Sequence, residues 1–297
     1  MRSFVQCLMT IGRMISANRL MRSVLYYLVG ILPKSILPNR LVIEIDDSRK
    51  LIVNPRNESH RMITFCGTYD PLDSSIVRDL VNDGDTVFDV GANLGWYTTL
   101  IGKRIGPHGS VVGIEPLPSV FSLLKKNISL NELENVILLN KAVAGKTESG
   151  FIHLFEGEPD THASIKPLGR TKLKRISIQL CTIDSIINEL DLHPNFVKID
   201  VEGAEMELLD GAISLLSETR PIIMLEVHFG TAKDSGHSPL YVLNRIRQFD
   251  YVFFQITGQR RLRKLSRRSK LRYVENLICV PFEKQKSVFN TLSLSEN

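Results

Sequence analysis

Residues 86–98 have the sequence Thr-Val-Phe-Asp-Val-Gly-Ala-Asn-Leu-Gly-Trp-Tyr-Thr, and this stretch decides the fold. The apolar run at 87–90 is typical of a buried parallel strand. Gly91, Asn93 and Gly95 follow in alternation, and a helix can continue after them. Glycine lets a backbone approach a ligand closely, and asparagine tolerates a left-handed conformation. A strand, a glycine-rich turn and a helix N-terminus together predict a site for an anionic or carboxylate-bearing ligand.

The next strand ends in an acidic residue. Glu115 follows the apolar run 111–114 and lies 20 positions after Gly95. An acid at this place can accept hydrogen bonds from both ribose hydroxyls of a nucleoside, although a solvated helix cap before Pro116 is the alternative. A dinucleotide-binding fingerprint would need a third glycine where this chain has Trp96, so the spacing disfavours a nicotinamide cofactor.

Apolar strands alternate with helices along the remaining chain, which predicts an α/β sheet covered on both faces. Strands are expected at 86–90, 111–115, 136–139, 196–200, 221–227, 251–256 and 275–280, and helices at 74–81, 94–105, 119–130, 183–190, 205–216 and 239–248. Alternation at 40–53 predicts a hairpin, and residues 65–71 are expected to form a loop. The polar loop 156–175, between strands at 151–155 and 176–180, is a candidate substrate flap.

Four regions are predicted from this pattern and from the charge. They are a basic amphipathic N-terminal extension at 1–40, a hairpin and lead-in loop at 41–75, a catalytic α/β domain at 76–282, and a frayed C-terminal tail at 283–297. The 297-residue chain has a formal net charge of +5. Residues 1–40 carry six basic residues and 260–272 carry eight, with no acid in either segment. The remainder is acidic, which argues against nucleic acid as a partner.

The N-terminal segment sets the expected location. Its longest apolar stretch, 24–32, is too short to span a bilayer, and a basic helix of this kind packs on the protein or lies on an anionic membrane face. The four cysteines are far apart and form no metal-binding motif or disulfide framework. We therefore expect a cytoplasmic protein in a reducing compartment, with peripheral membrane contact through residues 1–40 as an open alternative.

Four motifs in order resemble the FkbM family of S-adenosylmethionine-dependent methyltransferases. They are Asp89-Val90-Gly91-Ala92-Asn93-Leu94-Gly95, Glu115-Pro116, Lys198-Ile199-Asp200-Val201-Glu202-Gly203-Ala204-Glu205 and Glu226-Val227-His228. The upstream Gly67-Thr68-Tyr69-Asp70-Pro71 is similar to the family's lead-in, where a glutamate is more usual than Asp70. The resemblance covers roughly residues 60–282 and is specific for fold and cofactor rather than for substrate.

This resemblance implies a class I methyltransferase fold with a seven-stranded sheet, in the order 3-2-1-4-5-7-6 with the last strand antiparallel. It implies S-adenosylmethionine as the cofactor. No metal is assigned, and a divalent cation held by Asp200, Glu202 and Glu226 is left as an open alternative. The residues that would contact the cofactor are Asp89, Gly91, Asn93 and Gly95 at its methionine part, Glu115 at its ribose, and Asn140 to Ala142 beside its adenine.

Four ionisable residues are expected at the carboxyl edge of the sheet, where open α/β sheets bind ligands. Asp200 and Glu202 lie two positions apart and would point to one side if the strand continued, and Glu226 and His228 share that spacing. We expect His228 or Asp200 to be the general base, with Glu202 and Glu226 orienting the acceptor or the base. A hydrogen-bonded strand end is the simpler alternative for His228.

The function that we predict is O-methyl transfer to a hydroxyl of a sugar, glycan precursor or secondary metabolite. Tyr69 and Asp70 are candidate substrate-binding residues, or else caps of the helix that follows them. Trp96 is expected to contribute to helix packing, with a stacking platform for a ligand as the alternative. Two competing functions stay open at this point: a nicotinamide-dependent oxidoreductase, and an inactive binding module with a methyltransferase fold. The sequence leaves the oligomeric state undetermined.

Overall fold

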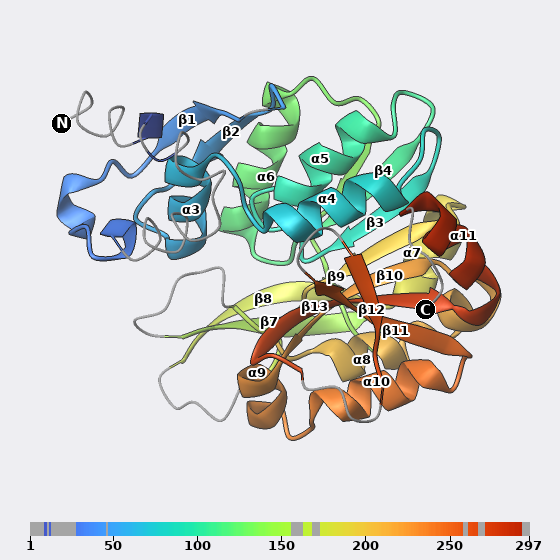
Figure 1. Ribbon diagram of the computed structural model, residues 1–297. Helices are drawn as coiled ribbons and strands as arrows, with labels where there is room; N and C mark the ends of the chain where they lie inside the picture. The colour runs from blue at the N-terminus through green and yellow to red at the C-terminus, as the bar shows by residue number, and fades with distance from the viewer. Residues whose placement is uncertain are drawn as a thin grey trace. The chain divides into compact units, whose positions relative to one another are not determined.

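The computed structural model describes residues 9–10, 12, 28–45, 47–155, 163–167, 173–257, 261–266 and 271–292, and Figure 1 shows its helices and strands. The chain divides into two compact units, which we describe separately. Unit 1 comprises Met1–Pro71 and Lys125–Glu132, and unit 2 comprises Leu72–Leu124 and Leu133–Asn297. Most of the predicted N-terminal helix and of the predicted flap at 156–175 lies outside the described residues.

Unit 1 contains the predicted hairpin. Strand β1 (Leu41–Glu44) pairs antiparallel with β2 (Lys50–Val53), after the short η1 (Lys34–Ile36). Helix α3 (Glu58–Cys66) follows and begins at Asn57, whose side chain accepts a hydrogen bond from the Ser59 backbone N–H. The expected loop at 65–71 is therefore wrong at its start, because the first two of these residues form the last turn of α3.

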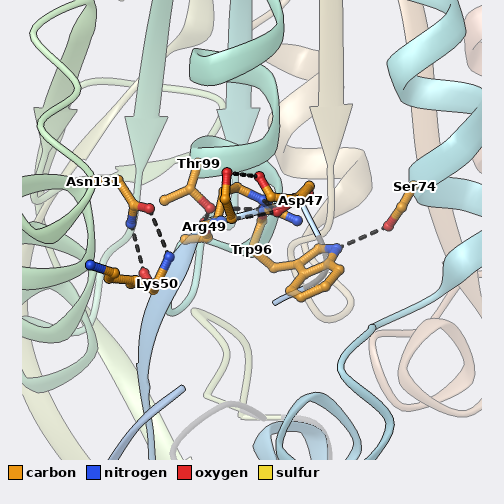
Figure 2. Close-up of polar contacts among 9 residues, drawn as sticks. Asp47, Arg49, Lys50, Ser74, Trp96, Thr99 and Asn131 are labelled. Carbon is orange, nitrogen blue, oxygen red and sulfur yellow. Dashed lines mark hydrogen bonds and ion pairs between the residues drawn. The ribbon is translucent and has the colours of Figure 1, made fainter. Parts of the chain in front are cut away.

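Two asparagines bind the backbone of β2 within unit 1. The amide of Asn127 accepts from Ile52 N at 2.7 Å and donates to Ile52 O at 3.3 Å. The amide of Asn131 does the same at Lys50, with distances of 2.9 and 2.7 Å (Figure 2). Residues i and i+4 on a helix lie about as far apart as residues i and i+2 on a strand. The two side chains therefore satisfy the strand backbone as a neighbouring strand would.

Unit 2 is organised around a sheet that has eight strands among the described residues, in the order β12-β11-β13-β10-β9-β3-β4-β5. Its strands are β3 (Thr86–Val90), β4 (Ser110–Ile114), β5 (Val136–Leu139), β9 (Phe196–Ile199), β10 (Ile222–His228), β11 (Tyr251–Thr257), β12 (Arg261–Lys264) and β13 (Val274–Pro281). Strand β13 runs antiparallel to both of its neighbours. Without β12, this is the expected order 3-2-1-4-5-7-6. The added β12 lies at the edge and pairs with β11.

Helices cover both faces of this sheet (Figure 1). They are α4 (Pro71–Leu80), α5 (Trp96–Arg104), α6 (Pro118–Leu130), α7 (Ile183–Leu190), α8 (Glu205–Asp210), α9 (Phe229–Asp234), α10 (Pro239–Arg247) and α11 (Gln285–Thr291), with the short helical turns η3 (Leu215–Thr219) and η5 (Phe282–Lys284). Buried side chains of α7, α8 and α10 form one apolar cluster with the central strands. On the other side, the Trp96 indole donates to Ser74 Oγ at 2.9 Å and joins α5 to α4 (Figure 2).

A second sheet of unit 2 has three strands in the order β6-β8-β7. Strand β7 (Glu148–Phe155) pairs antiparallel with β8 (Leu173–Cys181), in a register that runs from Glu148 opposite Leu180 to Phe155 opposite Leu173. Strand β6 (Ala142–Val143) pairs parallel with β8. The predicted strands at 151–155 and 176–180 are confirmed and are longer than expected.

Two other expectations are wrong. The helix expected at 205–216 breaks at Gly211, where a Cβ would lie 2.3 Å from the backbone oxygen of Ala144. The C-terminal tail is expected to be frayed, but its described part, up to residue 292, contains α11, which buries Val288. None of the described helices combines the length and the apolar character that crossing a membrane requires.

Candidate active site

The loop after β3 has a backbone that demands glycine. Gly91, Asn93 and Gly95 have φ angles of 80°, 51° and 94°, which is the left-handed region where glycine has no steric penalty. At Gly91 a Cβ would lie 1.8 Å from the backbone oxygen of Asp200. The backbone N–H groups of Gly91 and Ala92 both donate to Ile114 O, at 3.0 and 2.9 Å. The loop is therefore fixed to the ends of both neighbouring strands, β4 and β9.

Glu115 points toward this loop. Its Oε2 accepts from the Asn93 backbone N–H at 3.0 Å, and its Oε1 accepts from the Leu117 N–H at 2.9 Å. The residue is buried, and burial raises the pKa of its carboxyl to about 7. The carboxylate and the glycine-rich loop thus form one rigid unit at the carboxyl ends of β3 and β4.

Two buried acceptor atoms of this unit test the fit of a cofactor. Among the described residues, Asn93 Oδ1 and Asp89 Oδ1 have no hydrogen-bond partner. Buried polar atoms are nearly always paired in native structures, so both suit a ligand that donates hydrogen bonds. S-adenosylmethionine carries an ammonium group on its methionine part and hydroxyls on its ribose. Asp89 and Asn93 are therefore chemically suited to this cofactor, and their contact with it stays a prediction.

Asn140 binds the backbone beside the Glu115 carboxyl. Its Nδ2 donates to the backbone oxygens of Glu115 and Pro116, at 2.8 and 3.0 Å. Ala142 is buried and begins β6. The contact of Asn140 and Ala142 with adenine stays a prediction.

A buried lysine connects the loop to the next strand. Lys198 Nζ lies 3.1 Å from Asp200 Oδ2, 3.9 Å from Asp89 Oδ1 and 5.1 Å from the ring centroid of Tyr97. Asp89 also accepts from Thr98 Oγ1 at 2.6 Å. Burial raises the pKa of Asp89, although both Lys198 and Thr98 oppose this shift.

Glu202 occupies a turn rather than a strand. Strand β9 ends at Ile199, and Glu202 has φ = 49°, a conformation rare for a side-chain-bearing residue. The premise that strand geometry places Asp200 and Glu202 on one side is therefore wrong. Burial, followed by the charges of Asp200 and Glu205, raises the pKa of Glu202 to about 8, so the carboxyls still share one environment. Burial likewise raises the pKa of Glu205 to about 7.

The turn that contains Glu202 is bound by the segment that connects β7 and β8 of the second sheet. Ser164 Oγ donates to the backbone oxygen of Glu202 at 2.8 Å, and Lys166 forms an ion pair with Glu207. The described part of the predicted flap, residues 163–167, is thus fastened to the turn that carries two of the candidate catalytic carboxyls.

His228 and Glu226 lie at the end of β10. His228 Nδ1 accepts from the backbone N–H groups of Gly230 and Thr231, at 3.0 and 3.2 Å, and caps α9. An imidazole that accepts at Nδ1 carries its proton on Nε2 when neutral. Glu226 pairs with Asn276 of β13 in register, and its charge acts on Lys198.

Tyr69 and Asp70 lie in unit 1, in the short connection between α3 and α4. Asp70 has φ = 41°. Because every other candidate residue belongs to unit 2, the role of this pair in substrate binding stays a prediction. Within the parts of the chain that the structure describes, no three histidine, cysteine, aspartate or glutamate residues are placed to hold a metal ion.

Sequence reasoning gave Lys198 no role. The residue interrupts the apolar run of Phe196, Val197 and Ile199 in a central parallel strand. A charged residue in such a strand is almost never fully buried unless it is paired. A lysine within this apolar run, considered together with Asp89 and Asp200, was the feature of the sequence that could have indicated a buried ion pair.

Comparison with known proteins identifies a family model that matches this chain. The family model described as "Methyltransferase FkbM domain" matches residues 89–253. Hexuronic acid methyltransferase AglP from Haloferax volcanii is 29% identical over 166 residues, which are 53% of this chain and 63% of that protein. Methyltransferase 1 from Beauveria bassiana is 22% identical over 148 residues, which are 43% of this chain and 59% of that protein. The chain spans less than two thirds of each relative.

A solved structure shares the family name. The crystal structure of methyltransferase FkbM from Methylobacillus flagellatus KT is 19% identical, with a TM-score of 0.44 over 67% of this chain and 44% of that chain. The family match extends over more than half of the sequence, from Asp89 in β3 to Phe253 in β11. This chain belongs to the FkbM family of methyltransferases.

Proposed function

We propose that this protein transfers a methyl group from S-adenosylmethionine to a hydroxyl oxygen of a sugar, a glycan precursor or a secondary metabolite. One observation carries the proposal: in a chain of the FkbM family, the Asn93 N–H binds the Glu115 carboxylate at 3.0 Å. This bond joins the glycine-rich turn after β3 to the acid after β4, and a nucleoside cofactor needs both elements. The name of the Haloferax relative, a hexuronic acid methyltransferase, supports a sugar acceptor.

Each part of the cofactor has residues suited to hold it. Asp89 and Asn93 offer buried acceptors to the methionine ammonium, the backbone at Gly91 and Gly95 permits close approach, and Glu115 accepts from the ribose. When bound, S-adenosylmethionine supplies a methyl group whose S–CH₃ bond breaks with its electrons kept by sulfur, while a lone pair of the acceptor oxygen forms the O–CH₃ bond. The remaining work of the protein is to orient the acceptor and to take its proton.

Asp200 is the better candidate for the base. Its side chain is 27% exposed, and among the described residues its side-chain partner is Lys198 at Oδ2. An ionised carboxylate keeps acceptor capacity on its second oxygen. The acceptor's O–H bond breaks, and its proton passes to this carboxylate. His228 is less suited, because its accepting nitrogen already binds two backbone N–H groups.

Glu202 and Glu226 are left to orient the acceptor. The raised pKa of Glu202 keeps a proton on its carboxyl near neutral pH, so the group can donate a hydrogen bond to an acceptor oxygen as well as accept one. This donor suits a polyhydroxylated or carboxylated substrate such as a hexuronic acid.

The test compares three variants by transfer of labelled methyl from S-adenosylmethionine to a panel of hexuronic acid glycosides. Asp200→Asn should lower turnover by at least about 100-fold, which is the lower range for loss of a general base. His228→Asn preserves an N-cap acceptor and should keep turnover within about threefold. Glu218→Gln, at an exposed position of η3, is the control. If Asp200→Asn kept its turnover and His228→Asn lost it, His228 rather than Asp200 would be the general base.

A further inference from the structure

Lys198 is a cation inside the central sheet. It is 4% exposed and occupies β9 between Asp89 of β3 and Met224 of β10, its partners in register. An isolated ammonium at such a place would cost far more free energy than folding can supply, so it must be paired.

The pairing is asymmetric. One partner, Asp89, is 1% exposed and is itself fixed by Thr98. The other, Asp200, is closer to the ammonium and lies at the rim, where 27% of its side chain is exposed. The Tyr97 ring lies 5.1 Å from the same nitrogen, within the range of a cation–π contact. Lys198 is therefore anchored on its buried side and presents its charge to one carboxylate at the surface.

Lys198 stays protonated in this environment. Burial lowers the pKa of its ammonium, but the carboxylates of Asp200, Asp89 and Glu226 together outweigh burial and raise the pKa above its usual value. Lys198 is for this reason a fixed cation and not a proton carrier.

We propose that Lys198 is a positioning residue that holds the Asp200 carboxylate through Oδ2, so that its other oxygen is left for the proton of the methyl acceptor. The role rests on the proposed function, because it assigns the proton to Asp200. Lys198 keeps its own proton throughout. When Asp200 becomes neutral, the ammonium still has Asp89 as its counter-ion, and no buried charge is left unpaired.

The same arrangement couples the base to the cofactor loop. Asp89 precedes the glycine-rich turn by two residues, and Gly91 contacts the backbone of Asp200. Lys198 thus links the residue that binds the methionine part to the residue that takes the proton. Its removal should disturb proton transfer more than cofactor affinity.

The test uses the 297-residue chain and four variants. Lys198→Met removes the charge, Lys198→Gln keeps a donor without charge, Lys198→Arg keeps the charge, and Lys126→Met, at an exposed position of α6, is the matched control. The first readout needs no activity: the chemical shift of the Asp200 carboxyl carbon by NMR at one fixed pH, assigned with Asp200→Asn.

We expect the signal of the Asp200 carboxyl carbon to move in Lys198→Met and Lys198→Gln, because both remove the ammonium that lies 3.1 Å from Oδ2, and to keep its wild-type position in Lys198→Arg and Lys126→Met. Methyl transfer to a hexuronic acid glycoside should fall at least about 30-fold in kcat for the first two variants, with the Kd for S-adenosylmethionine within about fivefold. An unmoved Asp200 signal in a folded Lys198→Gln protein overturns the proposal. Failure of wild type to bind S-adenosylmethionine would instead overturn the proposed function, and the NMR signal of Asp200 would still decide the role of Lys198.

Discussion

The backbone N–H of Asn93 donates to Oε2 of Glu115 across 3.0 Å, and this bond joins the turn after β3 to the end of β4. The second carboxylate oxygen is held by Leu117 N at 2.9 Å. Because both oxygens are fixed by backbone groups, the acid is oriented before any ligand arrives. Such preorganisation lowers the cost of ordering a site on binding.

Cofactor affinity should depend on the protonation of Glu115. With its pKa raised to about 7 by burial, the carboxyl loses acceptor capacity as the pH falls through 7. The Kd for S-adenosylmethionine, measured by calorimetry, should therefore rise about tenfold between pH 8 and pH 6. In Glu115→Gln the Kd should be raised at all pH values, with little pH dependence. A wild-type pH profile retained by the variant would contradict this role.

Two glycines with the same backbone conformation separate steric conflict from backbone strain. Gly84 and Gly91 both have φ = 80°, but a Cβ at Gly84 meets nothing within 4 Å while one at Gly91 lies 1.8 Å from Asp200 O. Gly84→Ala should cost about 1–2 kcal/mol of unfolding free energy from its left-handed conformation alone. Gly91→Ala should cost at least about 2 kcal/mol more and abolish cofactor binding.

The measurement is urea denaturation followed by the fluorescence of Trp96, the single tryptophan. The Gly84→Ala protein is the matched control for cofactor affinity, which should be unchanged. Equal destabilisation by the two substitutions would mean that the loop moves away from Asp200 without cost.

The turn that carries Glu202 should make the free protein lose stability as the pH rises. Its folded pKa, about 8, lies above the value of about 4.3 expected in the unfolded chain. The stabilising contribution is complete below about pH 4 and is lost progressively as the pH rises toward 8. Glu202→Gln mimics the protonated acid and should be more stable than wild type at pH 8, by about 1–2 kcal/mol, and similar at pH 5. Chemical denaturation at the two pH values tests this, and a constant difference between them would contradict it.

The two asparagines that bind β2 differ in burial. Asn127 is fully buried, whereas the contacts of Asn131 are exposed to water. Leaving buried backbone groups unsatisfied costs about 1–3 kcal/mol, and exposed ones are satisfied by water. Asn127→Ala should therefore lower the unfolding free energy by about 2–3 kcal/mol, and Asn131→Ala by less than about 1 kcal/mol. Equal losses would show that burial does not set the cost.

Short-range patterns allowed the central part of the fold to be predicted. The apolar runs of β3, β4 and β9 are buried on both faces, so their sequences are nearly continuous in hydrophobic residues. The strand order came from resemblance to the family, because pairing between distant segments leaves no local pattern. The edge strand β12 could not be predicted from its own sequence, Arg-Leu-Arg-Lys, because this sequence has a single buried apolar residue.

The missed helices have specific causes. Helix α3 buries His60 and Arg61, so its inward face is not apolar in sequence. The Arg61 guanidinium donates to the backbone oxygens of Pro55, Val29 and Gly30, which are contacts that only the folded chain provides. Helix α9 is short and capped by a histidine, which is not among the preferred capping residues.

In the site, the sequence indicated the loop and the acid after β4, because both follow from spacing along the chain. It could not show that His228 caps a helix or that Glu202 leaves the strand, since both depend on backbone turns after the strands end. Lys198 was missed because a lysine in a strand has meaning only beside its carboxylate partners.

Calorimetric titration of the wild-type protein with S-adenosylmethionine, S-adenosylhomocysteine and NAD tests the central claim most directly. The account predicts that both sulfur nucleosides bind with a stoichiometry of one, that Glu115→Gln weakens both, and that NAD gives no binding heat. Binding of NAD, or the absence of binding by S-adenosylmethionine in a folded protein, would contradict it.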